Sequence, residues 1–82
     1  MIYLADSGFV LKRFNFGEAD RFVTLFTKEN GKVEVLAKGV RKITSKRSSH
    51  IEPLNLIKFN SVKSSKNFIL TEVELINSFE ER

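Results

Sequence analysis

The fold is decided by the stretch RFVTLFTKENGKVEVLAK, residues 21–38. Its first part is rich in β-branched and aromatic residues, and its last part alternates apolar with polar residues, both of which are typical of β-strands. Asn30-Gly31 lies between the two parts and favours a tight hairpin, because both residues tolerate the positive φ of a type I′ turn. We therefore predict two paired strands, at about 21–28 and 32–38.

Three further strands are predicted around this hairpin. Residues 8–14 form an earlier apolar run, which ends in a polar loop at 15–20. A fourth strand is expected at 54–59 and a fifth at 68–75, and the polar segment 61–67 between them is predicted to be a turn.

The resulting order is three strands, a basic connection at roughly 39–53, and two more strands. This is the element order of an OB-fold, a five-stranded Greek-key barrel, with an SH3-like barrel as the structural alternative. Closure into a barrel removes exposed strand edges, which matters for a chain of 82 residues with a small core. We predict an all-β protein with a single OB-fold domain over residues 1–82. Because the tail stops after the first turn of what reads as a helix, we expect this domain to be the N-terminal part of a longer protein.

The composition excludes several classes of function. The chain has no cysteine and one histidine, so it lacks the residues for a disulfide framework, a thiolate metal site or a multi-histidine site. Its apolar runs are too short for a transmembrane helix, and its N-terminus lacks the basic and apolar regions of a secretory signal. We expect a cytoplasmic protein with no cofactor, no metal and no membrane contact.

The net charge of +4 is unevenly distributed along the chain. Residues 1–31 are neutral overall, whereas residues 32–66 contain nine basic and two acidic residues, and residues 67–82 contain one basic and four acidic residues. The basic excess therefore lies in the middle of the chain. Nucleic acid is the commonest acidic partner of such a segment, because a polyanion relieves the mutual repulsion of its charges.

Catalytic patterns are weak. Ser48-Ser49-His50 places hydroxyls beside an imidazole, but neighbours in sequence do not make a triad, and we interpret His50 as a solvated loop residue. Glu72 and Glu74 are too few ligands for a hard cation. The chain also lacks the phosphate-binding, dinucleotide-binding and zinc-protease motifs. We expect that the protein is not an enzyme.

One short motif is expected to have a structural role. In Glu18-Ala19-Asp20-Arg21, a carboxylate can accept hydrogen bonds from backbone N–H groups and pair with Arg21.

The phenylalanines divide into two groups. OB-folds bind single strands by combining a basic groove with aromatic rings on which bases stack. Phe14 and Phe16 flank a polar turn and are the candidates for base stacking, with a role in covering the turn as the alternative. The core is expected to take the phenylalanines that lie in apolar runs, which are Phe9, Phe22, Phe26 and Phe68.

Basic residues near these elements are candidates for phosphate contacts. The sequence has no helix-turn-helix or zinc-finger pattern, so binding is expected to depend little on base sequence. The candidate residues for these nucleic-acid contacts are Lys12, Arg13, Arg21, Lys38, Arg41, Lys42, Lys46, Arg47 and Lys58.

Four stretches carry a resemblance to a known family. They are GFVLKR at 8–13, GEADRFVTLFT at 17–27, GKV at 31–33 and AKGVRK at 37–42. The Glu-Ala-Asp-Arg and Ala-Lys-Gly blocks at this spacing are specific in combination. The chain resembles the N-terminal domain of the bacterial recombination mediator RecO over essentially its whole length, and most closely over 8–42.

This resemblance implies an OB-fold that binds single- and double-stranded DNA. RecO-like proteins anneal complementary strands and, with RecR, help to load RecA onto DNA coated by single-strand-binding protein. The expected partners are therefore DNA and RecR-like and RecA-like proteins, at the nucleoid in the bacterial cytoplasm. Two alternatives stay open, namely a protein-interaction barrel that docks an acidic repair partner and an RNA-binding OB domain.

The sequence departs from the family in two respects. Leu54 follows Pro53, where the family usually has an aromatic residue. The helical domain and the zinc-binding module of typical members are absent from these residues, so contacts with single-strand-binding protein are expected only through those missing domains.

Overall fold

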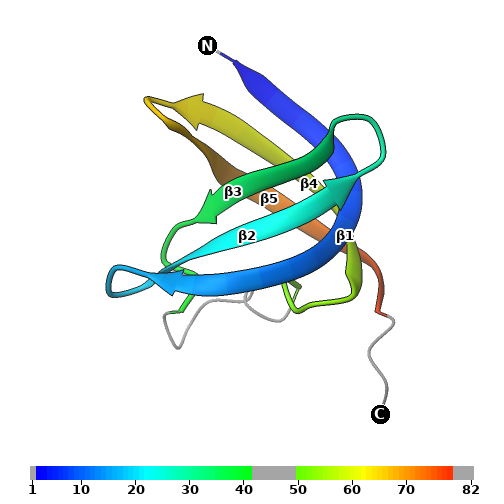
Figure 1. Cartoon of the computed structure of the whole chain (residues 1–82), viewed down its shortest axis with the longest axis horizontal. Coiled ribbons are helices and arrows are strands. Elements are labelled where there is room, and N and C mark those ends of the chain that lie inside the picture. The colour runs from blue at the N-terminus through cyan, green and yellow to red at the C-terminus, as the bar shows by residue number, and fades with distance from the viewer. Residues whose placement is uncertain (1, 42–49, 79–82) are drawn as a thin grey trace.

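Five strands form a closed barrel in the computed structural model, which describes residues 2–41 and 50–78 (Figure 1). The strands follow one another around the barrel in the order β1-β2-β3-β5-β4, in which β3 and β5 are parallel and the other neighbours antiparallel. This architecture confirms the predicted all-β class and fits the OB-fold. The strands are β1 (Tyr3–Phe16), β2 (Asp20–Thr27), β3 (Gly31–Ala37), β4 (Asn55–Ser64) and β5 (Asn67–Ser78).

No helix within these residues is long and apolar enough to span a membrane.

The long strand β1 holds the barrel together. Its first half, Tyr3–Phe9, pairs with β4, and its second half, Gly8–Phe16, pairs with β2. Figure 1 shows the resulting curve of β1 across the molecule. At Gly8 the strands approach so closely that a Cβ atom would lie 2.6 Å from the carbonyl oxygen of Phe26, so a side chain at this position would force the strands apart.

The core is built from residues that alternate along the strands and point into the barrel. Val23 and Leu25 of β2 and Ile57 and Phe59 of β4 are among its fully buried members. The β3–β4 connection contributes Val40 and Ile51, which are both fully buried. Because Val40 lies just after β3 and Ile51 just before β4, the two side chains anchor the connection at one end of the barrel.

Two predicted loops are shorter in the structure. The loop at 15–20 shrinks to a turn at 17–19, because Asn15 pairs with Arg21 and extends the β1–β2 ladder. The predicted turn at 61–67 begins only after Ser64. Ser61 is buried and its hydroxyl donates to the carbonyl of Leu4, so cross-strand hydrogen bonding overrides the low strand propensity of these polar residues.

The β2–β3 hairpin is confirmed, but its predicted turn type is wrong. The loop consists of residues 28–30, and Gly31 has a φ of 66° whereas the φ of Asn30 is not positive. A three-residue loop followed by a glycine in the left-handed region is the next most common hairpin geometry. Thr27 stabilises it, since its hydroxyl donates to the carbonyl of Gly31 and accepts a hydrogen bond from the N–H of Asn30.

Candidate nucleic-acid interface

Three arginines lie close together at the end of the barrel that Val40 and Ile51 occupy. Arg13 comes from β1, Arg21 from β2, and Arg41 from the first residues after β3. Partial burial lowers the pKa of Arg21 from its usual value, and the charges of Arg13 and Arg41 lower it further, whereas Glu52 opposes the shift. The charges of Arg13 and Arg41 therefore both act on the guanidinium of Arg21.

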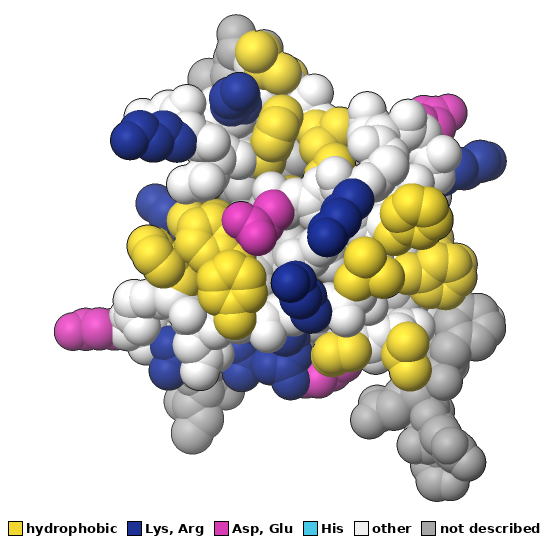
Figure 2. Space-filling model, in the orientation of Figure 1, with side chains coloured by type: hydrophobic (Ala, Val, Ile, Leu, Met, Phe, Trp, Pro, Cys, Tyr) yellow, Lys and Arg dark blue, Asp and Glu magenta, His cyan; other side chains and the backbone are white. Residues whose placement is uncertain are grey.

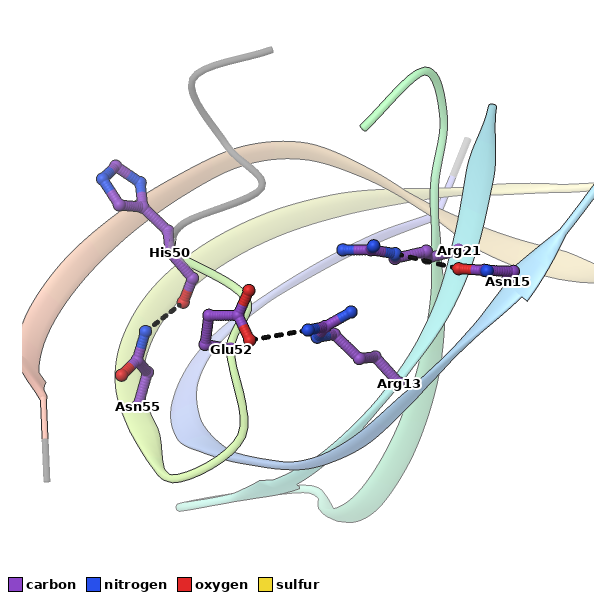
Figure 3. Close-up of polar contacts among 6 residues, drawn as sticks. All are labelled: Arg13, Asn15, Arg21, His50, Glu52 and Asn55. Atoms are coloured by element: carbon purple, nitrogen blue, oxygen red, sulfur yellow. Dashed lines mark hydrogen bonds and ion pairs between the residues drawn. The ribbon is translucent and has the colours of Figure 1, made fainter. Parts of the chain in front are cut away.

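Each guanidinium of this arginine cluster (Arg13, Arg21 and Arg41) is held by a neighbour. Arg13 Nη2 lies 2.7 Å from Glu52 Oε2, and Arg21 Nε donates to Asn15 Oδ1 at 3.1 Å (Figure 3). Arg41 Nη1 donates to the carbonyl of Gly17 at 3.0 Å. Across the part of the chain that the structure describes, Glu52 is the one carboxylate that forms an ion pair with the cluster, so the site keeps an excess of positive charge.

The start of the connection is tied to the β1–β2 turn. Asp20 Oδ1 accepts a hydrogen bond from the N–H of Gly39 at 2.7 Å, and the N–H of Arg41 donates to the carbonyl of Ala19 at 2.9 Å. A carboxylate of the Glu18–Arg21 motif thus binds a backbone N–H, as predicted. The predicted pairing of Arg21 with that carboxylate is wrong, because Arg21 donates to Asn15 instead.

The end of the connection is fixed to β1 and β4. The N–H of Leu54 donates to the carbonyl of Val10 at 2.9 Å, and Asn55 Nδ2 donates to the carbonyl of His50 at 2.9 Å (Figure 3). His50 is half-buried and its Nδ1 is shielded from solvent, so its interpretation as a solvated residue is wrong. Both ends of the connection are therefore held near the arginine cluster.

The remaining basic candidates lie in different places. Lys12 and Lys38 are exposed, on β1 and directly after β3. Lys58 lies opposite Glu74 in the ladder of β4 and β5, so the structure does not bring it to the cluster. The other three candidates fall outside the described residues and stay predictions: Lys42, Lys46 and Arg47.

Three aromatic rings pack together on the outer wall of the β1–β2 hairpin. Phe14 and Phe16 are 46% and 51% exposed, and their ring centroids lie 5.4 Å and 4.9 Å from that of the half-buried Phe22. Phe14 pairs with Phe22 across the two strands, which places all three rings outside the barrel. The assignment of Phe22 to the core is therefore wrong, and base stacking by Phe14 and Phe16 stays a prediction.

Two further phenylalanines were also assigned wrongly. Phe9 and Phe26 are 41% and 57% exposed, because they lie on the outer wall opposite each other in the β1–β2 ladder. Side chains alternate between the two faces of β2, so Phe26 lies on the face opposite the buried Val23 and Leu25. Both faces of β2 are apolar, so the pattern alone does not say which face is inside. Phe68 packs partly buried against the core, as expected.

Comparison with known proteins identifies the family. The family model described as "Recombination protein O N terminal" matches residues 1–79. Three curated relatives are named DNA repair protein RecO. The relatives from Nocardioides sp. and Acetivibrio thermocellus are 37% and 38% identical over 79 residues, and each match covers 96% of this chain and 32% of the relative. The relative from Cutibacterium acnes is 31% identical over 74 residues, which cover 90% of this chain and 30% of the relative. The chain spans about a third of the length of these relatives. Its five-stranded barrel and its sequence together show that the chain belongs to the family of the N-terminal domain of recombination protein O.

Proposed function

We propose that this domain binds single- and double-stranded DNA as the DNA-handling module of a recombination mediator. The observation that carries the proposal is the arginine cluster of Arg13, Arg21 and Arg41. Among the described residues, Glu52 alone forms an ion pair with it. Guanidinium groups bind phosphate oxygens through charge-assisted hydrogen bonds, so such an excess suits a DNA backbone. The name of the curated relatives, DNA repair protein RecO, supports the same conclusion.

The exposed rings at the end of the β1–β2 hairpin suit unpaired bases. Phe14 and Phe16 lie in the last residues of β1, and Asn15 between them binds Arg21. Because side chains alternate between the two faces of a strand, Arg13 and Asn15 lie on the opposite face of the ladder from these rings. A strand whose phosphates contact the arginines therefore reaches the rings by passing around the end of the β1–β2 hairpin. Stacking of this kind tolerates any base. Contacts with phosphates and ring faces carry little sequence information, so we propose that binding depends weakly on sequence.

Annealing of complementary strands requires no catalytic group, and we propose that this domain is not an enzyme. Basic side chains that neutralise phosphates reduce the repulsion between two complementary strands, which is a sufficient physical contribution. Within a full-length mediator, we propose that the domain handles DNA while RecR-like and RecA-like proteins take part in loading. Contact with single-strand-binding protein is assigned to the other parts of such longer chains.

The experiment is fluorescence anisotropy of labelled oligonucleotides, titrated with the protein at several salt concentrations. We expect binding at low salt, with a log affinity that falls linearly with log salt by roughly 0.7 for each single-strand phosphate contacted. Absence of binding to both single strands and duplexes at low salt would overturn the proposal. A matched RNA that outcompetes DNA would favour the RNA-binding alternative instead.

A further inference from the structure

A groove lies on the outer side of β1, where the pairing of this strand changes from β4 to β2. Two hollows of about 330 Å³ and 340 Å³ adjoin there, since both are lined by Ser7 and Lys28. Small residues of β1 form the floor, namely Ala5, Ser7 and Gly8. From Ala5 to Phe9 an extended strand spans about 13 Å at ~3.3 Å per residue, which gives the length of the groove.

The wall on the β2 side is the loop of the β2–β3 hairpin, which is tied to β1. The N–H of Lys28 donates to the carbonyl of Ser7 at 2.8 Å. Asp6 Oδ2 accepts the N–H of Glu29 at 3.1 Å and the side-chain amide of Asn30 at 2.7 Å. Figure 1 shows this loop beside the first half of β1. The exposed side chains of Lys28 and Glu29 are therefore held at the rim of the groove.

The opposite wall comes from β4 and β5 and repeats this charge pattern. Lys58 of β4 lines the groove and lies opposite Glu74 in the β4–β5 ladder. Both side chains are exposed. Each wall of the groove therefore carries charges of both signs.

Apolar side chains line the two hollows. Phe9, Phe26 and Ile76 are exposed, and Leu56 is half-buried. Figure 2 shows hydrophobic side chains gathered at the right of the view, where β1 curves past the end of β2, with acidic and basic side chains just above them. Apolar groups that gather on a surface and are rimmed by polar groups are typical of protein–protein interaction sites.

We propose that this groove is the interface of a reversible homodimer, whose occupant is a second copy of this chain. A two-fold axis brings the same patch of both copies together, so the patch must be complementary to itself. Walls that carry both signs meet this requirement, because a lysine of one copy can face a glutamate of the other. A polyanion or a strongly acidic peptide would instead meet the like charges of Glu29 and Glu74.

The interface is separate from the proposed DNA-binding function and does not depend on it. Arg21 of the arginine cluster lies at the start of β2, whereas Lys28 directly follows the end of this strand. The dimer therefore leaves both arginine clusters accessible. A groove of this length is small compared with interfaces that bury ~800 Å² of each partner, so we expect a dissociation constant of roughly 10 to 300 µM.

The test is sedimentation equilibrium of the nucleic-acid-free protein at low salt, from roughly 1 µM to 1 mM, a range that brackets the expected dissociation constant. We expect the average mass to rise from that of one copy toward that of two copies. A wild type that stays monomeric over the whole range overturns the proposal.

Ile76→Ser removes an exposed apolar side chain from each copy and is expected to weaken association by roughly tenfold or more. Phe16→Ser is the matched control, because Ile76 and Phe16 are both 51% exposed and Phe16 lies at the far end of β1. It is expected to associate like the wild type. Equal association of the two variants would contradict a role of the groove.

Charge reversal makes the test specific to the two walls. Lys28→Glu combined with Lys58→Glu makes both walls acidic, and Glu29→Lys combined with Glu74→Lys makes both walls basic. Each double variant alone is expected to stay monomeric, because like charges then face each other. An equimolar mixture is expected to associate at least as tightly as the wild type, which also shows that both variants fold. If the mixture stays monomeric, or if either variant alone associates like the wild type, the two-fold interface is overturned.

Discussion

Arg13 and Glu52 form an ion pair, with 2.7 Å between Nη2 and Oε2, that joins β1 to the β3–β4 connection. The two side chains are 26% and 37% exposed, and pairs so accessible to water stabilise a fold by only ~0–1 kcal/mol. The ion pair matters more for the charge of the arginine cluster than for the stability of the fold. Glu52 neutralises one guanidinium of the arginine cluster, and it occupies the donor that a phosphate would use.

Glu52→Gln is therefore expected to raise the affinity for DNA. The amide carries no charge, so Arg13 becomes available to a phosphate, and the log affinity–log salt slope should steepen by roughly 0.7 for a single strand. Anisotropy titrations at three or more salt concentrations measure both quantities. Glu72→Gln on the outer wall of β5 removes the same charge far along the chain from the cluster and serves as the control. An equal gain in both variants would mean that net charge, and not the released Arg13, is responsible.

The basic connection is expected to contribute several phosphate contacts. Replacing Arg41, Lys42, Lys46 and Arg47 together with alanine should flatten the salt slope by roughly 0.7 for each single-strand contact that is lost. Lys63→Ala combined with Lys66→Ala, at the β4–β5 turn, gives a control that lowers net charge elsewhere. A slope that stays at the wild-type value in the fourfold variant contradicts a role of the connection in binding.

Much of the fold could be predicted because the barrel interior imposes a period of two on the strands. Val23 and Leu25 of β2 carry this pattern, and Gly31 marks the hairpin. The ends of strands were predicted less well. Asn15 and Ser61 are polar residues that a local pattern assigns to turns. Asn15 is kept in β1 by its pairing with Arg21 across a tight turn, and Ser61 by a hydrogen bond to Leu4, which is 57 residues away.

The candidate site was predictable in part. Basic charge located Arg13, Arg21 and Arg41 individually, but only the barrel geometry brings them together. The exposure of Phe26 was missed because β2 has apolar residues on both faces, and a local pattern does not distinguish the core face from the outer face. Glu52 was not recognised because its partner Arg13 is 39 residues away.

Asp20 is expected to stabilise the start of the connection. Its carboxylate accepts the N–H of Gly39 at 2.7 Å, and Asp20→Ala leaves that N–H without its acceptor. Hydrogen bonds to charged groups contribute ~1.5–3 kcal/mol, so the free energy of unfolding should fall by about 2 kcal/mol. Asp20→Asn keeps an oxygen acceptor and should lose less. Urea unfolding followed by circular dichroism measures these differences, and equal losses in the two variants would contradict the role of the hydrogen bond.

Asp6 is expected to make the domain sensitive to acid. Partial burial raises the pKa of this carboxyl and is the largest single influence on it. Hydrogen bonds from the Asn30 side chain, the N–H groups of Ser7 and Glu29, and the Thr27 side chain together outweigh burial and lower the pKa below its usual value of 3.8. Because the folded pKa lies below the unfolded one, the stabilisation is present above pH 3.8 and is lost as the pH falls through the folded value.

Asp6→Asn removes this titration, so its free energy of unfolding should fall less steeply than that of the wild type as the pH decreases below about 4. Urea unfolding at several pH values between about 2 and 6 gives the two curves. Glu34→Gln, which removes an exposed carboxylate from the wall of β3, is the control and should retain the steep acid dependence of the wild type. If Asp6→Asn instead follows the wild-type curve throughout, the hydrogen bonds that hold the β2–β3 loop to β1 do not depend on the charge of Asp6.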